Sequence, residues 1–182
     1  MSLYDALEKM SARYTELEGL LADPDVALVK GFYERPETGG VGGGRTTELM
    51  ARPLLATFFP DLNGIRQPLG GEYAGQRSIL ERVPFAQGYG VETALLIDIA
   101  AMVGVDRIAQ VDLGVRLHRH RPLADLSPQA MEVLHAVMHR VDLADHHELS
   151  RVLARPGSPV VDAHVDERPP LLETPGYPTH ED

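Results

Sequence analysis

The chain has 182 residues, of which 43% are hydrophobic, and a formal net charge of -10 at pH 7. This length suits one domain with a small appendage, and the negative charge argues against a general nucleic-acid-binding surface. Because the sequence contains no cysteine, disulfides, zinc–thiolate sites and thiol catalysis are excluded. No apolar run approaches the roughly 20 residues of a membrane span. The N-terminus lacks the apolar core of a signal peptide, so we expect a soluble cytoplasmic protein.

Residues 2–22 are predicted to form one amphipathic helix, because apolar side chains recur at spacings of three and four. Such a seam is typical of packing against another helix. Asp23, Pro24 and Asp25 end the helix, and at a helix end this Asp-x-Asp pattern indicates a turn instead of a metal site. The seam consists of Leu3, Leu7, Met10, Tyr14, Leu17 and Leu21.

A glycine-rich run at residues 39–44 follows a predicted buried strand at 26–33 and leads into a helix that begins with Arg45, Thr46 and Thr47. Free backbone N–H groups and the helix dipole at such a start favour an anion. The alternative is a flexible linker whose helix is capped by a threonine. The Gly-Lys-Ser/Thr of a Walker loop is missing, so a nucleotide P-loop is excluded.

Residues 67–72 are predicted to turn into a helix that runs to about Val83. A glycine-flanked Tyr89 and Glu92 then open a second, apolar helix over residues 93–103. Glu92 in the first turn has two interpretations that the sequence leaves open. It either complements the helix dipole or points its carboxylate at a substrate.

Residues 108–115 are predicted to form a strand that leads into a basic run ending at Pro122. Strand alternation places Arg116 and His118 on one face. An imidazole between guanidiniums resists protonation and stays available as a neutral metal ligand. The guanidiniums can bind a phosphate or carboxylate bidentately. The alternative is a basic strand end in solvent.

The last third of the chain is predicted to contain a helix of about four turns with Ser127 as its cap and Pro128 at its first position. His135 and His139 lie four residues apart on this helix and are expected to be surface residues, because no Glu-x-x-His context accompanies them. From residue 155 onward, recurrent prolines predict an extended tail.

Five segments occur in one order along the chain and together resemble the glucosyl-3-phosphoglycerate synthase family, retaining glycosyltransferases of the GT-A class. The related mannosyl-3-phosphoglycerate synthases share these motifs. The resemblance covers roughly residues 19–126 and, more weakly, 166–170. The segments are VKGFYERP at 29–36, GGRTTEL at 43–49, QPLGGEYA at 67–74, GYGVE at 88–92 and VRLHRHRP at 115–122.

This resemblance implies transfer of glucose from UDP-glucose to the 2-hydroxyl of 3-phosphoglycerate by a homodimer that uses Mg²⁺ or Mn²⁺. It implies Glu92 as the carboxylate near the reacting groups and His118 as a metal ligand. His120 departs from the asparagine expected at its position, which bears on acceptor preference. The implied substrate-binding residues are Gly44, Arg45, Thr46 and Thr47 for the acceptor, Tyr89 in the same pocket, Arg116 on the diphosphate, and His120 and Arg121.

The fold expected from the resemblance is α/β: an incomplete GT-A fold that lacks most of the nucleotide-binding half and carries an N-terminal amphipathic helix and a Pro-rich tail. A GT-A enzyme holds its nucleotide in an N-terminal half, whereas only about 25 residues precede the first predicted strand. Residues 12–24 are also similar to the first helix of bacterial class I peptide chain release factors. The expected division is therefore 1–25, 26–154 and 155–182, with the activity of the isolated chain impaired.

Two other functions remain open from the sequence. The first is a non-catalytic module that binds phosphorylated hydroxy acids through Arg45 and the glycine-rich run. The second is a ribosome-associated fragment that acts through residues 2–22, although the net negative charge argues against it.

Overall fold

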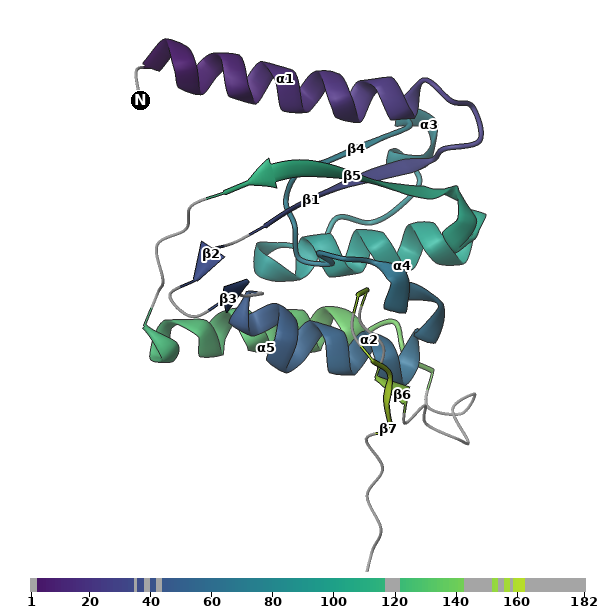
Figure 1. Ribbon diagram of the computed structural model, residues 1–182. Helices are drawn as coiled ribbons and strands as arrows, with labels where there is room; N and C mark the ends of the chain where they lie inside the picture. The colour runs from purple at the N-terminus through teal and green to yellow at the C-terminus, as the bar shows by residue number, and fades with distance from the viewer. Residues whose placement is uncertain are drawn as a thin grey trace, which may run out of the picture.

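The computed structural model describes residues 3–34, 36–37, 40–41, 44–116, 122–142, 152–153, 156–157 and 159–162. Its helices are α1 (Leu3–Leu21), α2 (Arg52–Phe58), α3 (Arg77–Leu80), α4 (Val91–Val103) and α5 (Leu126–Met138). Its strands are β1 (Leu28–Glu34), β2 (Pro36–Glu37), β3 (Gly40–Val41), β4 (Tyr73–Gly75), β5 (Ile108–Val115), β6 (Val152–Leu153) and β7 (Val161–Asp162). The result is a mixed α/β structure whose largest described sheet has the order β4-β1-β5 (Figure 1).

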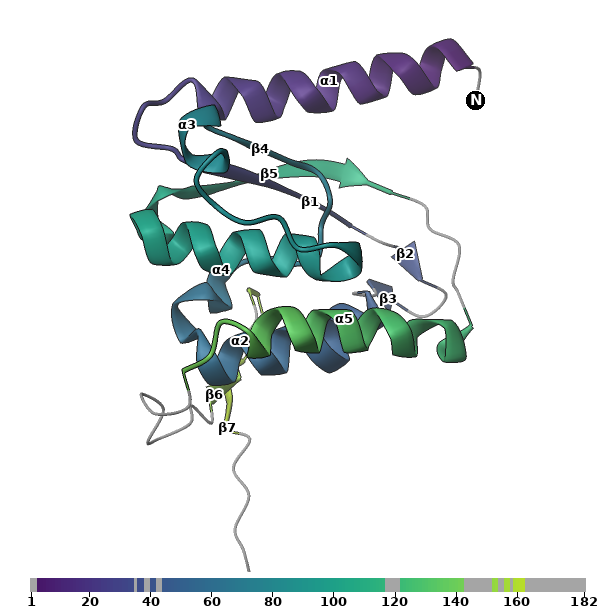
Figure 2. The same ribbon diagram turned by 180° about the vertical axis from the view of Figure 1, so that it is seen from behind.

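The central strand β1 pairs with β5 in parallel and with β4 in antiparallel orientation. Leu28 and Val29 point to opposite faces, yet both are at most 1% exposed. β1 is buried on both faces because α1 covers one side of the sheet and α4 the other (Figures 1 and 2). This explains why the strand predicted at residues 26–33 reads as a nearly continuous apolar run.

Helix α1 matches the bounds predicted for the N-terminal helix, but the expected packing against another helix is wrong. Its contacts are with β1, β4 and β5, so it covers the open face of the sheet. Leu17 is buried in this contact, whereas Tyr14, a predicted member of the apolar seam, is 59% exposed.

Helix α4 lies between the sheet and a further layer that contains α2 and α5 (Figure 2). It is apolar almost all round, as a helix with neighbours on two sides must be. Asp98 on its far side accepts two hydrogen bonds, of 2.8 and 2.6 Å, from the guanidinium of Arg140 just after α5. The buried core around α4 includes Leu28, Leu55, Leu62, Leu95, Leu96, Ile99, Ile108 and Val137.

Two sequence predictions of local structure are corrected. The helix predicted to run from residues 67–72 to Val83 is instead strand β4 followed by the short helix α3, because Tyr73–Gly75 adds to the free edge of β1. Helix α5 begins at Leu126 with Asp125 at its N-cap, so Ser127 lies inside the helix. In addition, β6 and β7 pair as a hairpin across the predicted boundary at residue 155.

Candidate functional site

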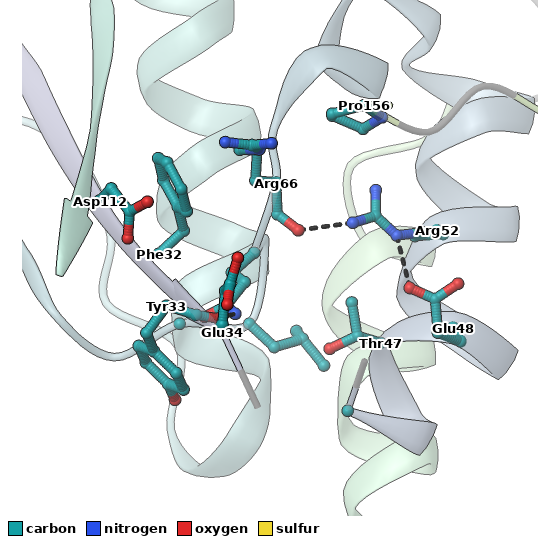
Figure 3. Close-up of a pocket in the computed structure, with 13 residues that line it drawn as sticks. Phe32, Tyr33, Glu34, Thr47, Glu48, Arg52, Arg66, Asp112 and Pro156 are labelled. Carbon is teal, nitrogen blue, oxygen red and sulfur yellow. Dashed lines mark hydrogen bonds and ion pairs between the residues drawn. The ribbon is translucent and has the colours of Figure 1, made fainter. Parts of the chain in front are cut away.

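A cavity of about 220 Å³ lies where the parallel strands β1 and β5 end (Figure 3). In open α/β sheets, ligands bind at the carboxyl ends of the strands. The cavity is bounded by the end of β1, the start of the helical segment that contains α2, the loop before β4, Asp112 of β5 and Pro156. Its lining residues are Phe32, Tyr33, Glu34, Gly44, Thr47, Glu48, Arg52, Arg66, Gln67, Leu69, Gly70, Asp112 and Pro156.

The end of the glycine-rich run forms one wall of this cavity. Helical hydrogen bonding starts there, since the N–H of Glu48 donates to the carbonyl of Gly44 at 2.9 Å. Gly44 and Thr47 line the cavity, and Thr47 is 8% exposed. Thr46 is the residue before the π-helical turn η1 (Thr47–Ala51) and its side chain makes no capping hydrogen bond. Thr46 therefore does not cap this turn with its side chain.

The π-helical turn has a physical cause in the sequence. The N–H of Arg52 donates to the carbonyl of Thr47, five residues earlier, and Pro53 has no N–H with which to continue a regular ladder. Such turns occur frequently at functional sites. The widened turn places Thr47 and Arg52 on the cavity side of the helix (Figure 3).

Two guanidiniums lie in the cavity wall, and they differ in what they contact. Arg52 donates to the carboxylate of Glu48 at 2.8 Å and to the carbonyl of Ile65 at 3.3 Å, so its charge is used to hold the wall together. The guanidinium of Arg66 lies 4.5 Å from the ring centroid of Phe32. A guanidinium over an aromatic ring can still bind a carboxylate or phosphate group through its N–H donors.

Residues 67–72, the wall segment, connect the cavity to two of the predicted site residues. Within this segment Gln67, Leu69 and Gly70 line the cavity. A Cβ atom added at Gly71 would lie 3.4 Å from Oε1 of Glu92. The next residue, Glu72, forms an ion pair with Arg116. Glu92 and Arg116 therefore adjoin the wall segment, and neither is among the residues that line the cavity.

The remaining predicted site residues have the following positions. Arg45 and Thr46 adjoin the cavity wall but do not line the cavity. Tyr89 is 45% exposed, its backbone N–H donates to the carboxylate of Glu132 on α5 at 2.6 Å, and it is not among the residues that line this cavity. His118, His120 and Arg121 lie outside the described residues.

Sequence reasoning missed Lys30, a buried charge in the middle of β1. This residue is 3% exposed, and its ammonium donates to the carbonyl of Gly70 and lies 5.4 Å from the ring centroid of Tyr73. Burial lowers the pKa of Lys30 to about 8, while the nearby carboxylate of Glu92 acts in the opposite direction. Burial and Glu92 both raise the pKa of Tyr73. The signal was present in the sequence, because a lysine interrupts an otherwise apolar strand.

The described residues bear on metal and membrane binding in two respects. They contain no group of three or more His, Cys, Asp or Glu side chains that could hold a metal ion. The predicted ligand His118 lies outside them, so the metal site stays a prediction. None of the helices in the described ranges has the length and hydropathy needed to cross a bilayer.

Comparison with known proteins identifies clear relatives. The glucosyl-3-phosphoglycerate synthase of Mycolicibacterium smegmatis is 53% identical over 131 residues, which are 69% of this chain and 43% of that protein. The synthase of Petrotoga mobilis is 44% identical over 185 residues, which cover 90% of this chain and 55% of that protein. No family model matches the chain.

Solved structures of a glucosyl-3-phosphoglycerate synthase are also similar to this chain. The crystal structure of glucosyl-3-phosphoglycerate synthase from Mycobacterium tuberculosis in complex with Mn²⁺, UDP-glucose and phosphoglyceric acid is 48% identical. It matches with a TM-score of 0.63 over 70% of this chain and 43% of that chain. The chain spans about half the length of the curated relatives it matches. It is therefore a homologue of the glucosyl-3-phosphoglycerate synthases and matches the C-terminal half of these proteins.

Proposed function

We propose that residues 26–154 form the acceptor side of a glucosyltransferase that moves glucose from UDP-glucose to 3-phosphoglycerate. One observation carries this proposal: Gly44 and Thr47 line a cavity at the strand ends, in a chain 48% identical to a structure that holds phosphoglyceric acid. The alignments to the mycobacterial relatives extend over 131 to 134 residues, close to the length of this region. We further propose that the region is part of a GT-A fold and that the chain forms a homodimer.

In this proposal the acceptor's phosphate and carboxylate bind at the helix start formed by Gly44, Arg45, Thr46 and Thr47. Backbone N–H groups at a helix start are unsatisfied donors that suit an anion. The hydroxyl of Thr47 faces the same cavity and can donate a further hydrogen bond. Glycine at position 44 lets the ligand approach the backbone closely.

The chemistry requires that the acceptor hydroxyl be held beside the sugar while charge grows on the leaving diphosphate. Fixing the acceptor in place accounts for much of such an acceleration, and cationic groups stabilise the developing charge. We assign the positioning of the acceptor to the cavity and to Glu92, which lies close to Gly71. We assign the stabilisation of the developing charge to Arg116. Tyr89, His120 and Arg121 remain proposed substrate contacts.

A divalent ion such as the Mn²⁺ of the mycobacterial complex would supply further charge stabilisation on the diphosphate. The described residues of this chain provide no ligand cluster for it. We therefore propose His118 as a ligand of this ion.

Calorimetric titration of 3-phosphoglycerate into the chain tests the proposal, with Arg45→Ala and with Arg13→Ala on α1 as a control of equal charge change. We expect saturable binding that weakens at least tenfold in Arg45→Ala and is unchanged in Arg13→Ala. Glycerol 3-phosphate, which lacks the carboxylate, is expected to bind more weakly. Equal affinities for the wild type and Arg45→Ala would remove the assignment of this helix start.

Turnover distinguishes a transferase from a binding module. With UDP-glucose, 3-phosphoglycerate and Mn²⁺, we expect the 182-residue chain to form glucosyl-3-phosphoglycerate slowly or not at all. Turnover close to that of the full-length relatives would contradict the expectation of impaired activity. Binding without any turnover would favour a module that binds phosphorylated hydroxy acids.

A further inference from the structure

Lys30 occupies the point on β1 where the hydrophobic core meets the cavity. Side chains at alternate positions of a strand share a face, so Leu28, Lys30 and Phe32 lie on the same side of the sheet. Leu28 belongs to the buried core and Phe32 lines the cavity. A buried ammonium therefore separates the apolar core from the proposed ligand site.

Three connections fix the wall segment, residues 67–72, to β1. The ammonium of Lys30 donates to the carbonyl of Gly70. The N–H of Gly31 donates to the carbonyl of Glu72 at 2.8 Å. The side-chain amide of Gln67 donates to the carbonyl of Tyr33. Of these three hydrogen bonds, the bond from Lys30 comes from a charged side chain. Its acceptor belongs to Gly70, which lines the cavity.

The approach between β1 and the wall segment is close enough to require glycine. A Cβ atom added at Gly31 would lie 2.4 Å from Cδ1 of Leu113 and 3.2 Å from the carbonyl oxygen of Glu72. A Cβ atom at Gly70 would lie 3.1 Å from the carbonyl oxygen of Gly31. β1 and the wall segment are therefore in close backbone contact on either side of the Lys30–Gly70 hydrogen bond.

The electrostatic surroundings of Lys30 connect it to the proposed reaction site. Glu92 on α4 is the carboxylate whose charge acts on Lys30, and Tyr73 on β4 is the titratable neighbour beside its ammonium. The register partner on β5 is the uncharged Gln110. Since Lys30 makes no ion pair within the described part of the chain, its buried charge is compensated by the carbonyl of Gly70 and by the electrostatic effect of Glu92.

We propose that Lys30 is a positioning residue that holds the wall segment through the carbonyl of Gly70 and balances the charge of Glu92, so that the cavity binds a phosphorylated hydroxy acid. The identity of that ligand rests on the proposed function, whereas the positioning role rests on the contacts of Lys30. A buried ammonium with incomplete compensation costs stability. A lysine that served stability alone would be poorly suited to this position.

The test compares Lys30→Met, which keeps the length of the side chain and removes its charge, with Arg77→Met as the control. Arg77 is 91% exposed and its ion pair with Glu81 lies on the surface, so the control removes an equal charge far from the cavity. Amide hydrogen exchange across residues 67–72 is the first readout. We expect about tenfold faster exchange in Lys30→Met and no change in Arg77→Met.

The second readout is the free energy of unfolding as a function of pH, which is measured without ligand. A lysine whose pKa is lowered from 10.5 to about 8 on folding binds more protons in the unfolded state between these values. The wild type should therefore gain stability as the pH rises from about 8 to 10.5. Lys30→Met should lack this gain, and at pH 7 it should be at least as stable as the wild type.

The third readout is the dissociation constant for 3-phosphoglycerate as a function of pH. Above about pH 8 the neutral Lys30 leaves the charge of Glu92 unbalanced, so wild-type affinity should fall several-fold between pH 7 and 9.5. The affinity of Lys30→Met should be low and constant over this range. Because the raised pKa of Tyr73 keeps that phenol neutral below its ordinary value of 10.0, Tyr73 does not contribute.

The outcomes separate the two proposals. If the wild type binds no 3-phosphoglycerate, the proposed function fails, while hydrogen exchange and the pH series still decide the role of Lys30. If Lys30→Met matches Arg77→Met in exchange, in affinity and in pH dependence, the positioning role is refuted and the proposed function stands. Should Lys30→Met fail to fold, the wild-type pH series of stability and affinity decides by itself.

Discussion

Arg116 and Glu72 form an ion pair that joins the residue after β5 to the end of the wall segment. The backbone N–H of Arg116 also donates to the carbonyl of Glu34 at 2.9 Å, and its guanidinium lies 5.2 Å from the ring centroid of Tyr33. These contacts fix the point at which the chain leaves the sheet towards residues 117–121. The proposed diphosphate contact is thus held by the same segment that lines the acceptor cavity.

Removing one partner of this pair should have a small effect that depends on salt. We expect Glu72→Gln to lower the free energy of unfolding by about 0.5–1 kcal/mol, because Arg116 is partly exposed and water screens the pair. The difference should shrink in 1 M salt. Denaturant unfolding of Glu72→Gln, Arg116→Gln and the double variant measures the coupling. A coupling energy of zero at low salt would show that the pair does not hold the wall.

The hydroxyl of Thr47 is predicted to contribute to ligand binding. Thr47→Val keeps the shape of the side chain and removes the hydroxyl, so the dissociation constant for 3-phosphoglycerate should rise about tenfold, as expected for a hydrogen bond to a charged group. Calorimetry measures this change. The protein's stability should change little, because the helix start keeps its backbone hydrogen bond between Glu48 and Gly44.

Thr93→Val provides the matched control for that substitution. The hydroxyl of Thr93 on α4 is fully buried and has no hydrogen-bond partner among the described residues. Removing it should stabilise the protein by about 1 kcal/mol, since an unsatisfied buried polar group is lost, and should leave ligand affinity unchanged. Equal losses of affinity in Thr47→Val and Thr93→Val would contradict the assignment of Thr47.

Two glycine substitutions should act on stability in opposite directions. In Gly90→Ala the new Cβ would lie 2.8 Å from Cβ of Ala136 and 2.9 Å from the carbonyl oxygen of Glu132 on α5. We expect a loss of about 1–3 kcal/mol from this overpacking. Gly19 lies in α1 with nothing within 4 Å of its added Cβ. Gly19→Ala should therefore gain about 0.5–1 kcal/mol from helix propensity. Thermal unfolding of both variants checks these signs.

Elements with strong local patterns could be predicted from the sequence. The apolar run of β1, the eight residues of β5 and the apolar helix α4 lie within about two residues of their predicted bounds. The apolar patterns of β1 and α4 follow from burial on two sides, which the sequence records directly. The family relationship could also be predicted, because five motifs occur in one order.

Features set by contacts between distant residues could not be predicted in the same way. β4 is a strand because Tyr73 pairs with Lys30, more than 40 residues earlier in the chain. The role of Lys30 depends on the carbonyl of Gly70, which local periodicity does not place beside it. Likewise, Glu92 lies close to Gly71 and Arg116 pairs with Glu72, and no local sequence pattern predicts these contacts between distant residues.

The most direct test of the central claim is a crystal structure of the chain with 3-phosphoglycerate. The account predicts ligand density in the cavity of Figure 3, with the phosphate or carboxylate against the backbone N–H groups near Gly44 and the hydroxyl of Thr47. Density for the ligand at a site that touches neither Gly44 nor Thr47, with this cavity filled only by water, would contradict it.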